Sequence, residues 1–271
     1  MHGDVIPILD ARRALGRRAG QVPGGAAEPA AGPGFAALWR RSAGLPLTEV
    51  VPAAPGDAAA AAGFSLALLA RGQAEGGLAV WSLPDFSFGE EGAPDAEGLA
   101  QFGLDLDRLL LVRGPRQADA LWAAEEALSL PGAAVLASIM PSRQGLDLTA
   151  TRRLLLRAER QGTRCLLLRL DMAGCGPMSN SPMGNSAAGM RWRVAAASSD
   201  TAGRGADGGG GARELGPPTF AVHLDRNRSG PAGLSWRLRW NAHARDFHLL
   251  DDAAGAGLDG DLAAAAGNRS A

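Results

Sequence analysis

Residues 48–72, TEVVPAAPGDAAAAAGFSLALLARG, have the pattern of an apolar strand, a tight turn and a helix. Nucleotide-binding proteins place a glycine-rich loop at such a junction, where backbone amides and a lysine hold the phosphates and a hydroxyl binds Mg²⁺. Aligned with the template G-x-x-x-x-G-K-[ST], the sequence has Pro52 and Asp57 for the glycines, Ala58 for the lysine and Ala59 for the hydroxyl. We therefore expect this turn to bind no nucleotide.

Asp57 adds a negative charge at the start of the expected helix, where a phosphate would otherwise lie. A carboxylate at this position favours an N-cap, in which it accepts hydrogen bonds from the first free amides of the helix. The sequence thus predicts that Asp57 takes the place of the anion and stabilises the helix by about 1 kcal/mol.

The other positions needed for ATP hydrolysis also lack the required side chains. The apolar run AVLASIM has Ala137 and Ser138 where a magnesium-binding aspartate would end the strand. Asp85, Glu90 and Glu91 follow the run LAVWSLP and are the nearest substitutes for a catalytic acid. Because all 27 basic residues are arginines, no lysine can hold a phosphate or form a Schiff base. We expect no enzymatic activity and no cofactor.

Cysteine and histidine offer no metal site or nucleophile by their spacing. Cys165 lies in an apolar run and Cys175 in a glycine-rich segment, which predicts one core thiol and one loop thiol. The four histidines have no i, i+3 or i, i+4 spacing, and His223 should face outward between the inward residues Phe220, Val222 and Leu224 of a strand. No G-x-S-x-G motif is present.

Composition indicates a globular chain of 271 residues with one substantial core. Its net charge of −1 argues against a dedicated nucleic-acid binder. We find no run of 18 apolar residues and no apolar signal segment after the first arginines, so the sequence predicts a cytoplasmic protein without a membrane partner.

Strands that are apolar on both faces alternate with helical patterns from residue 47 onward, which predicts a parallel sheet covered by helices on both sides. Three later segments alternate between apolar and polar residues, as half-buried antiparallel strands do. The expected strands are 47–51, 78–83, 108–112, 133–140, 163–170, 191–194, 219–225, 235–240 and 246–250, and the expected helices are 58–71, 96–102, 117–128 and 148–161.

The ends of the chain have a different composition from this core. Residues 1–43 are rich in Arg, Gly and Pro and predict a flexible arm, while residues 251–271 predict a disordered tail. Residues 44–250 then form one domain, interrupted by two loops, 172–190 and 198–218, whose roles the sequence leaves open.

Residues 96–128 resemble the middle of the RecA recombinase core in their order of helix, short G-[LV]-D link, apolar strand and helix. The chain more closely resembles the ImuA family of bacterial mutagenesis proteins, which are RecA-like and also described as SulA-like. The matching segments are EVVPAAPGDAAAAAGFSLALLA, LDLTATRRLLL, RWRV and GPP followed by two alternating strands. This resemblance spans about residues 44–250 and implies a RecA-like three-layer core with a mainly parallel sheet, C-terminal antiparallel strands and a degenerate phosphate-binding loop.

The resemblance also implies a role in SOS-induced, error-prone translesion DNA synthesis. The implied partners are the Y-family polymerase-like protein ImuB and a replicative-type error-prone polymerase, with RecA as a further candidate. Two alternatives stay open, namely a SulA-like inhibitor of cell division and a degenerate ATPase that retains weak nucleotide binding. The missing lysine disfavours the degenerate ATPase. The SulA-like inhibitor differs from the translesion role only in the partner that it binds.

Two groups of arginines are candidates for partner contact. Arg153, Arg157 and Arg160 are spaced i, i+4 and i+7 on one face of the helix 148–161, with Leu154 and Leu155 inward. Arg237 and Arg239 should share the outward face of the strand 235–240, opposite Trp236, Leu238 and Trp240. Arginines on rigid elements can steer an acidic partner, whereas we expect only weak or indirect contact with DNA.

Overall fold

The computed structural model describes residues 5–6, 35, 38, 44–74, 77–141, 146–172, 186–199 and 216–252. Their helices are α3 (Ala58–Ala74), α4 (Phe86–Glu91), α5 (Ala96–Gln101), α6 (Gln117–Ala127) and α7 (Leu148–Gln161). Short 3-10 turns lie at Pro55–Asp57 (η2), Leu106–Arg108 (η3) and Leu170–Met172 (η4).

The strands of the described residues join in a single sheet. They are β1 (Val5–Ile6), β2 (Leu47–Pro52), β3 (Ala79–Pro84), β4 (Leu109–Gly114), β5 (Ala134–Ile139), β6 (Arg164–Arg169), β7 (Met190–Ala196), β8 (Thr219–Asn227), β9 (Leu234–Asn241) and β10 (Asp246–Asp252). Their order across the sheet is β1-β4-β3-β5-β6-β2-β7-β8-β9-β10.

Pairing is parallel through the centre of this sheet and antiparallel at its sides. All neighbours from β4 to β7 in the sheet order are parallel. The pairs from β7 to β10 are antiparallel, and so is the pair between β1 and β4. The predicted fold class, an α/β protein with a mainly parallel core and C-terminal antiparallel strands, is confirmed, whereas the sequence reasoning did not find β1.

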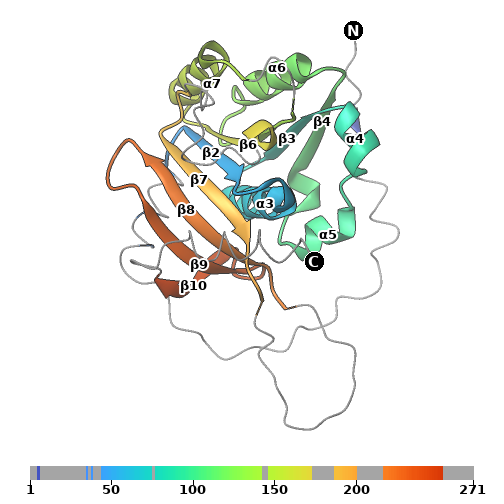
Figure 1. Ribbon diagram of the computed structural model, residues 1–271. Coiled ribbons are helices and arrows are strands. Elements are labelled where there is room, and N and C mark those ends of the chain that lie inside the picture. The colour runs from blue at the N-terminus through green and yellow to red at the C-terminus, as the bar shows by residue number, and fades with distance from the viewer. Residues whose placement is uncertain are drawn as a thin grey trace.

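Helices cover both faces of the parallel strands, which gives three layers (Figure 1). Adjacent strand residues point to opposite faces, and Trp81 of β3 belongs to the core beneath α3 while Val80 belongs to the core beneath α6 and α7. Phe64 of α3 is fully buried, and Leu154 of α7 is only 2% exposed. The two apolar cores therefore hold β2 and its neighbours rigidly between helices.

The antiparallel strands extend the α3 side of the core with aromatic residues. Phe64 of α3 lies 6.0 Å from Trp192 and 5.2 Å from Phe247, measured between ring centroids. Trp236, Leu238 and Trp240 of β9 are all buried, so the predicted alternation of this strand is confirmed. His223 on β8 faces the opposite side and is part-exposed, also as predicted.

The predicted domain boundaries at residues 43 and 251 stay predictions, because most of the arm and nearly all of the tail lie outside the described residues. Two residues of the arm that the structure does describe, Phe35 and Leu38, belong to the core. Phe35 is 1% exposed and its ring lies 5.5 Å from that of Trp236. Core packing therefore begins before residue 44.

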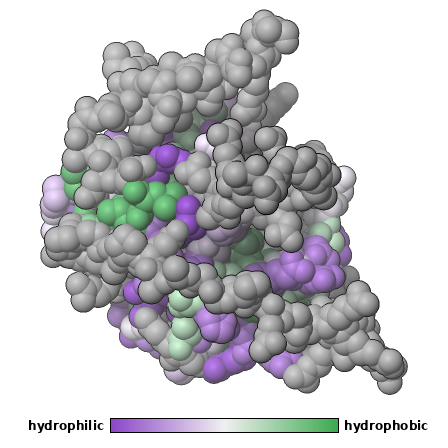
Figure 2. Space-filling model, turned by 90° about the horizontal axis from the view of Figure 1, so that it is seen from below, coloured by the Kyte–Doolittle hydropathy of each residue, from purple (hydrophilic) through white to green (hydrophobic). Residues whose placement is uncertain are grey.

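The described surface mixes polar and apolar residues. Seen from below (Figure 2), hydrophilic residues are spread over the described part of this face, and hydrophobic residues gather at the left. None of the helices in the described ranges has the length and apolar character needed to cross a membrane.

Candidate functional site

The turn between β2 and α3 lies at the carboxyl end of a central parallel strand, where α/β proteins commonly bind ligands. After β2 the chain stays bonded to β7, because the Ala53 amide donates to the Val194 carbonyl at 2.8 Å. It then enters η2, in which Pro55 pre-sets the backbone and Asp57 is 8% exposed. The four substituted positions of the phosphate-binding template lie around this turn: Pro52 ends β2, Asp57 ends η2, and Ala58 and Ala59 begin α3.

The Asp57 carboxylate occupies this turn by bonding to two amides. Its Oδ2 accepts from the Ala54 amide at 3.1 Å, and its Oδ1 accepts from the Ala196 amide at the end of β7, also at 3.1 Å. The expectation that Asp57 is an N-cap for the first amides of α3 is therefore wrong. It is the last residue of η2, and its carboxylate ties the turn to β7 rather than to the helix that follows.

Ala58 and Ala59 begin α3 without a charged or hydroxyl side chain, as the sequence requires. At the end of β5, the Ser138 hydroxyl accepts from the Trp81 indole nitrogen at 2.9 Å, so this position packs against β3. Asp85 forms an ion pair with Arg113. Glu90 and Glu91 end α4, and their side chains lie outside the described part.

Two of the three candidate arginines on α7 bind the neighbouring helix. Arg153 forms an ion pair with Glu125 of α6, and Arg157 donates to Ser129 at 3.0 Å and pairs with Glu126 at 3.2 Å. Arg160 is exposed near the end of α7. The expected uniform arginine face is thus partly neutralised by carboxylates of α6, and its role in partner contact stays a prediction.

Arg237 and Arg239 lie on the outward face of β9, as predicted, and both are half-buried. The Arg237 guanidinium donates to the Ser198 carbonyl at 3.3 Å. Arg193 of β7, on the same side of the sheet, pairs with Asp225 at 2.7 Å. This side therefore carries arginines that already have partners within the chain, and their contact with another protein stays a prediction.

A buried ion network on β2, β6 and β7 is absent from the sequence predictions. Glu49 is fully buried and pairs with Arg169 at 3.1 Å and with Arg191 at 2.8 Å. Arg169 also pairs with Asp171 at 2.7 Å, and these carboxylates raise the arginine's pKa although burial alone would lower it. The available signal was one acid within the apolar strand LTEVVP, because a charge is buried only when it is paired.

Cys165 is a free thiol in the core, as predicted, and burial raises its pKa to about 12. Cys175 lies outside the described residues. No group of three or more potential metal ligands occurs among the described side chains.

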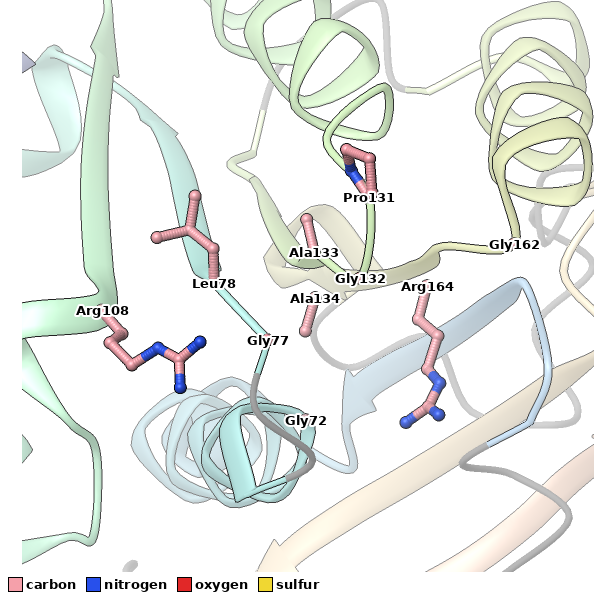
Figure 3. A pocket seen from close by; sticks show the side chains of 10 residues that line it. All are labelled: Gly72, Gly77, Leu78, Arg108, Pro131, Gly132, Ala133, Ala134, Gly162 and Arg164. Atoms are coloured by element: carbon pink, nitrogen blue, oxygen red, sulfur yellow. The ribbon is translucent and has the colours of Figure 1, made fainter.

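The opposite edge of the sheet, where β3, β5 and β6 begin, has a cavity of about 350 Å³. Arg108 and Arg164 extend into it from two sides, close to the C-terminal end of α3 (Figure 3). The rest of its wall consists of small or apolar residues, namely Gly72, Gly77, Leu78, Pro131, Gly132, Ala133, Ala134 and Gly162. This cavity could not be predicted from the sequence, because its wall comes from four separate segments.

Comparison with known proteins identifies the family. No family model matches the chain. The ImuA proteins of two Caulobacter vibrioides strains, NA1000 / CB15N and ATCC 19089 / CIP 103742 / CB 15, are each 35% identical to it over 178 residues, which cover 64% of this chain and 67% of theirs.

Among solved structures, RadB recombinase is similar with a TM-score of 0.48 and 15% identity, covering 76% of this chain and 90% of its own. SulA from Pseudomonas aeruginosa is similar with a TM-score of 0.35 and 24% identity, covering 45% and 96%. The sequence identity to the two curated relatives, over two thirds of their length, shows that this chain belongs to the ImuA family.

Proposed function

We propose that this protein is a non-catalytic, RecA-like accessory protein of an SOS-induced, error-prone translesion DNA synthesis complex, and that it acts through protein contacts. Membership of the ImuA family supports the pathway. The proposal that the protein is non-catalytic rests on the turn between β2 and α3, where the Asp57 carboxylate accepts hydrogen bonds from the Ala54 and Ala196 amides.

A phosphate entering this turn would meet a negative charge in place of a lysine. Two like charges about 4 Å apart repel by roughly 4 kcal/mol at an effective dielectric constant near 20, and the missing lysine removes an attraction of similar size. The turn also has no glycine at the two template positions, where the backbone must approach a phosphate closely. We therefore expect neither ATP binding nor ATP hydrolysis.

The proposed partners are the Y-family polymerase-like protein ImuB and a replicative-type error-prone polymerase, with RecA as a further candidate. These assignments rest on the family. The rigid core supports them physically, because a sheet held between two helical layers can present fixed surfaces without a nucleotide switch.

The test is a chromosomal deletion of the gene in its own host, with the frequency of mutations induced by ultraviolet light as the measurement. We expect the frequency to fall to the uninduced level and to recover when the gene is supplied in trans. An unchanged frequency would contradict the proposed role, whereas abnormally long cells on overexpression would instead favour the SulA-like alternative. Purified protein that hydrolyses ATP, and loses this activity in an Asp57→Lys variant, would contradict the non-catalytic assignment.

A further inference from the structure

We propose that the cavity at the amino-terminal edge of the parallel strands binds an acidic side chain of a partner protein. The carboxylate would lie between Arg108 and Arg164, and a small neighbouring residue would enter an adjoining hollow that ends at Thr48. This inference rests on the proposed function, since it assigns one of the contacts through which such an accessory protein would act.

The charge around the cavity favours an anion. Arg108 is exposed, Arg164 is half-buried, and both extend into the cavity (Figure 3). Arginine recognises a carboxylate through two parallel N–H groups. Both arginines also have contacts within the chain, which a ligand carboxylate would join or replace. The C-terminal carbonyls of α3 also attract cations, so the arginines alone would not define a binding site.

The second observation is a buried hydroxyl without a partner. A hollow of about 30 Å³ shares Gly72, Ala134 and Arg164 with the larger cavity and extends to Thr48 on β2. Thr48 is 1% exposed, and within the described part its Oγ1 forms no hydrogen bond. A buried hydroxyl without a partner is unfavourable, so the site gains stability if a ligand supplies the missing hydrogen bond.

The wall of this hollow offers few polar groups that could hold a buried water beside the Thr48 hydroxyl. Besides Thr48 and the two arginines Arg71 and Arg164, its lining is aliphatic or glycine, with Leu45, Leu68 and Leu166 as the largest members. A buried water needs two to four polar partners, and Arg71 is already engaged with Asp246 at 2.8 Å. A serine beside the acidic residue of a partner would provide both a hydroxyl and a methylene for this environment, and a threonine would provide a hydroxyl and a methyl group.

The shape of the site favours an acidic peptide over a nucleic acid. Nucleic-acid backbones bind to cations spread along an extended groove, with strong dependence on salt. Here the arginines converge on one cavity, and its adjoining hollow is mainly apolar. A carboxylate side chain would fill the cavity between the arginines while a small neighbouring residue fills the adjoining hollow. A phosphodiester would fill only the cavity.

The glycine amides of the cavity wall provide a direct measurement. The full-length ¹⁵N-labelled protein is titrated with the blocked peptide acetyl-Ala-Ser-Glu-Ala-amide, and the control is the same peptide with Gln in place of Glu. We expect the Glu peptide to shift the amide signals of Gly72, Gly77, Gly132 and Gly162, and the Gln peptide to bind about tenfold more weakly.

Three variants locate the site. Arg108→Gln and Arg164→Gln should each weaken binding of the Glu peptide about tenfold, because each removes a charge-assisted hydrogen bond. Thr48→Val replaces the hydroxyl with a methyl group. We expect the wild-type protein to bind the Ser-Glu peptide more tightly than acetyl-Ala-Ala-Glu-Ala-amide, and this variant to bind the two equally. Arg152→Gln, on the exposed face of α7, is the matched control and should leave binding of the Glu peptide unchanged. The unperturbed signals of each variant show that it is folded.

Two results would overturn the proposal. One is failure of the wild-type protein to bind the Glu peptide at millimolar concentration. The other is a single-stranded oligothymidylate that shifts the same glycine amides and loses this effect in the two arginine variants. In either case, a deletion strain that still loses induced mutagenesis would leave the proposed function standing, so the failure of the site and the failure of the role are distinguishable.

Discussion

Asp57 illustrates how a single carboxylate can fix a turn that a bound anion would otherwise order. Its two oxygens accept from Ala54 within the turn and from Ala196 on β7, two residues that are far apart in the sequence. The amides of Ala53, Ala54 and Asp57 in this turn thus all donate to groups of the chain itself. The same carboxylate would repel a phosphate, which is the physical reason for the proposal that this turn binds no nucleotide.

Replacing Asp57 with Ala should destabilise the protein by about 1–3 kcal/mol, because two amides lose their acceptor in a part-buried site. Asp57→Asn retains one carbonyl oxygen and should cost less. The measurement is the free energy of unfolding in urea, with Glu159→Ala on the exposed face of α7 as a control for loss of a charge. Equal stability of all three variants and the wild type would show that the carboxylate does not hold the turn.

Because its thiol is buried, Cys165 should make the folded protein less stable as the pH rises above 9. Burial raises its pKa from 9.0 to about 12, so above pH 9 the unfolded chain releases the thiol proton while the folded chain retains it. The folded state then binds more protons, and its stability must fall as the pH rises from 9 toward 12.

A Cys175→Ser variant, in which Cys165 is the only thiol, tests this prediction. We expect negligible modification by iodoacetamide at pH 8 in buffer and complete modification in denaturant, because only the unfolded chain has a substantial fraction of thiolate. A further change of Cys165 to Ala should reduce the slope of stability against pH above 9. Rapid modification of the folded protein would contradict the buried position.

At the level of elements, most of the fold could be predicted because each central strand is a short apolar run between turn residues. The segment 148–161 was predicted as a helix with the bounds that α7 has, since Asp147 accepts from the Ala150 amide at its start and Gly162 adopts a left-handed conformation at its end. Both are local signals. Packing partners are not local, and so the pairing of Arg153 with Glu125 and the insertion of Phe35 beside Trp236 could not be read from the sequence.

Some features of the candidate site could likewise be predicted from local sequence, and others could not. The replaced template residues at Pro52, Asp57, Ala58 and Ala59 could be predicted, because phosphate binding depends on residue types at fixed spacing. The acceptor role of Asp57 toward Ala196 could not, because it depends on where β7 lies beside β2. For the same reason the cavity between Arg108 and Arg164 became visible only in three dimensions.

The ion pairs between α6 and α7 predict the effect of charge reversal on the arginine face. Arg153→Glu should destabilise the protein by about 1 kcal/mol, because it places a second acid beside Glu125 at a partly exposed site. Combining it with Glu125→Arg should restore most of the loss. Arg160→Glu, farther along the same helix, should have little effect on unfolding in urea. If Arg153→Glu is fully stable yet loses binding to purified ImuB, the arginine acts in partner contact rather than in joining the helices.

At the scale of the whole molecule, the two apolar cores depend on one continuous sheet, and the chain before residue 44 contributes to one of them. Phe35 and Leu38 pack into the core that contains α3 and the antiparallel strands. Their burial links the N-terminal region to Trp236 and hence to the last part of the fold. The stable unit should therefore begin earlier than the change in composition at residue 43 indicates.

Two truncations test this boundary. A protein that begins at residue 34 keeps Phe35 and Leu38. Among the described contacts it loses the pairing of the two-residue strand β1 with β4 at the edge of the sheet, so we expect its stability to stay close to that of the full chain. A protein that begins at residue 44 loses both buried side chains and should be less stable by at least the 3–5 kcal/mol or so that a buried phenylalanine contributes. Thermal unfolding measured by circular dichroism compares them, with full-length Phe35→Ala as the matched point variant. Because Phe35→Ala removes the ring without shortening the chain, it should reproduce most of the difference between the two truncations. Equal unfolding temperatures for both truncated proteins would instead place the start of the cooperative unit at residue 44.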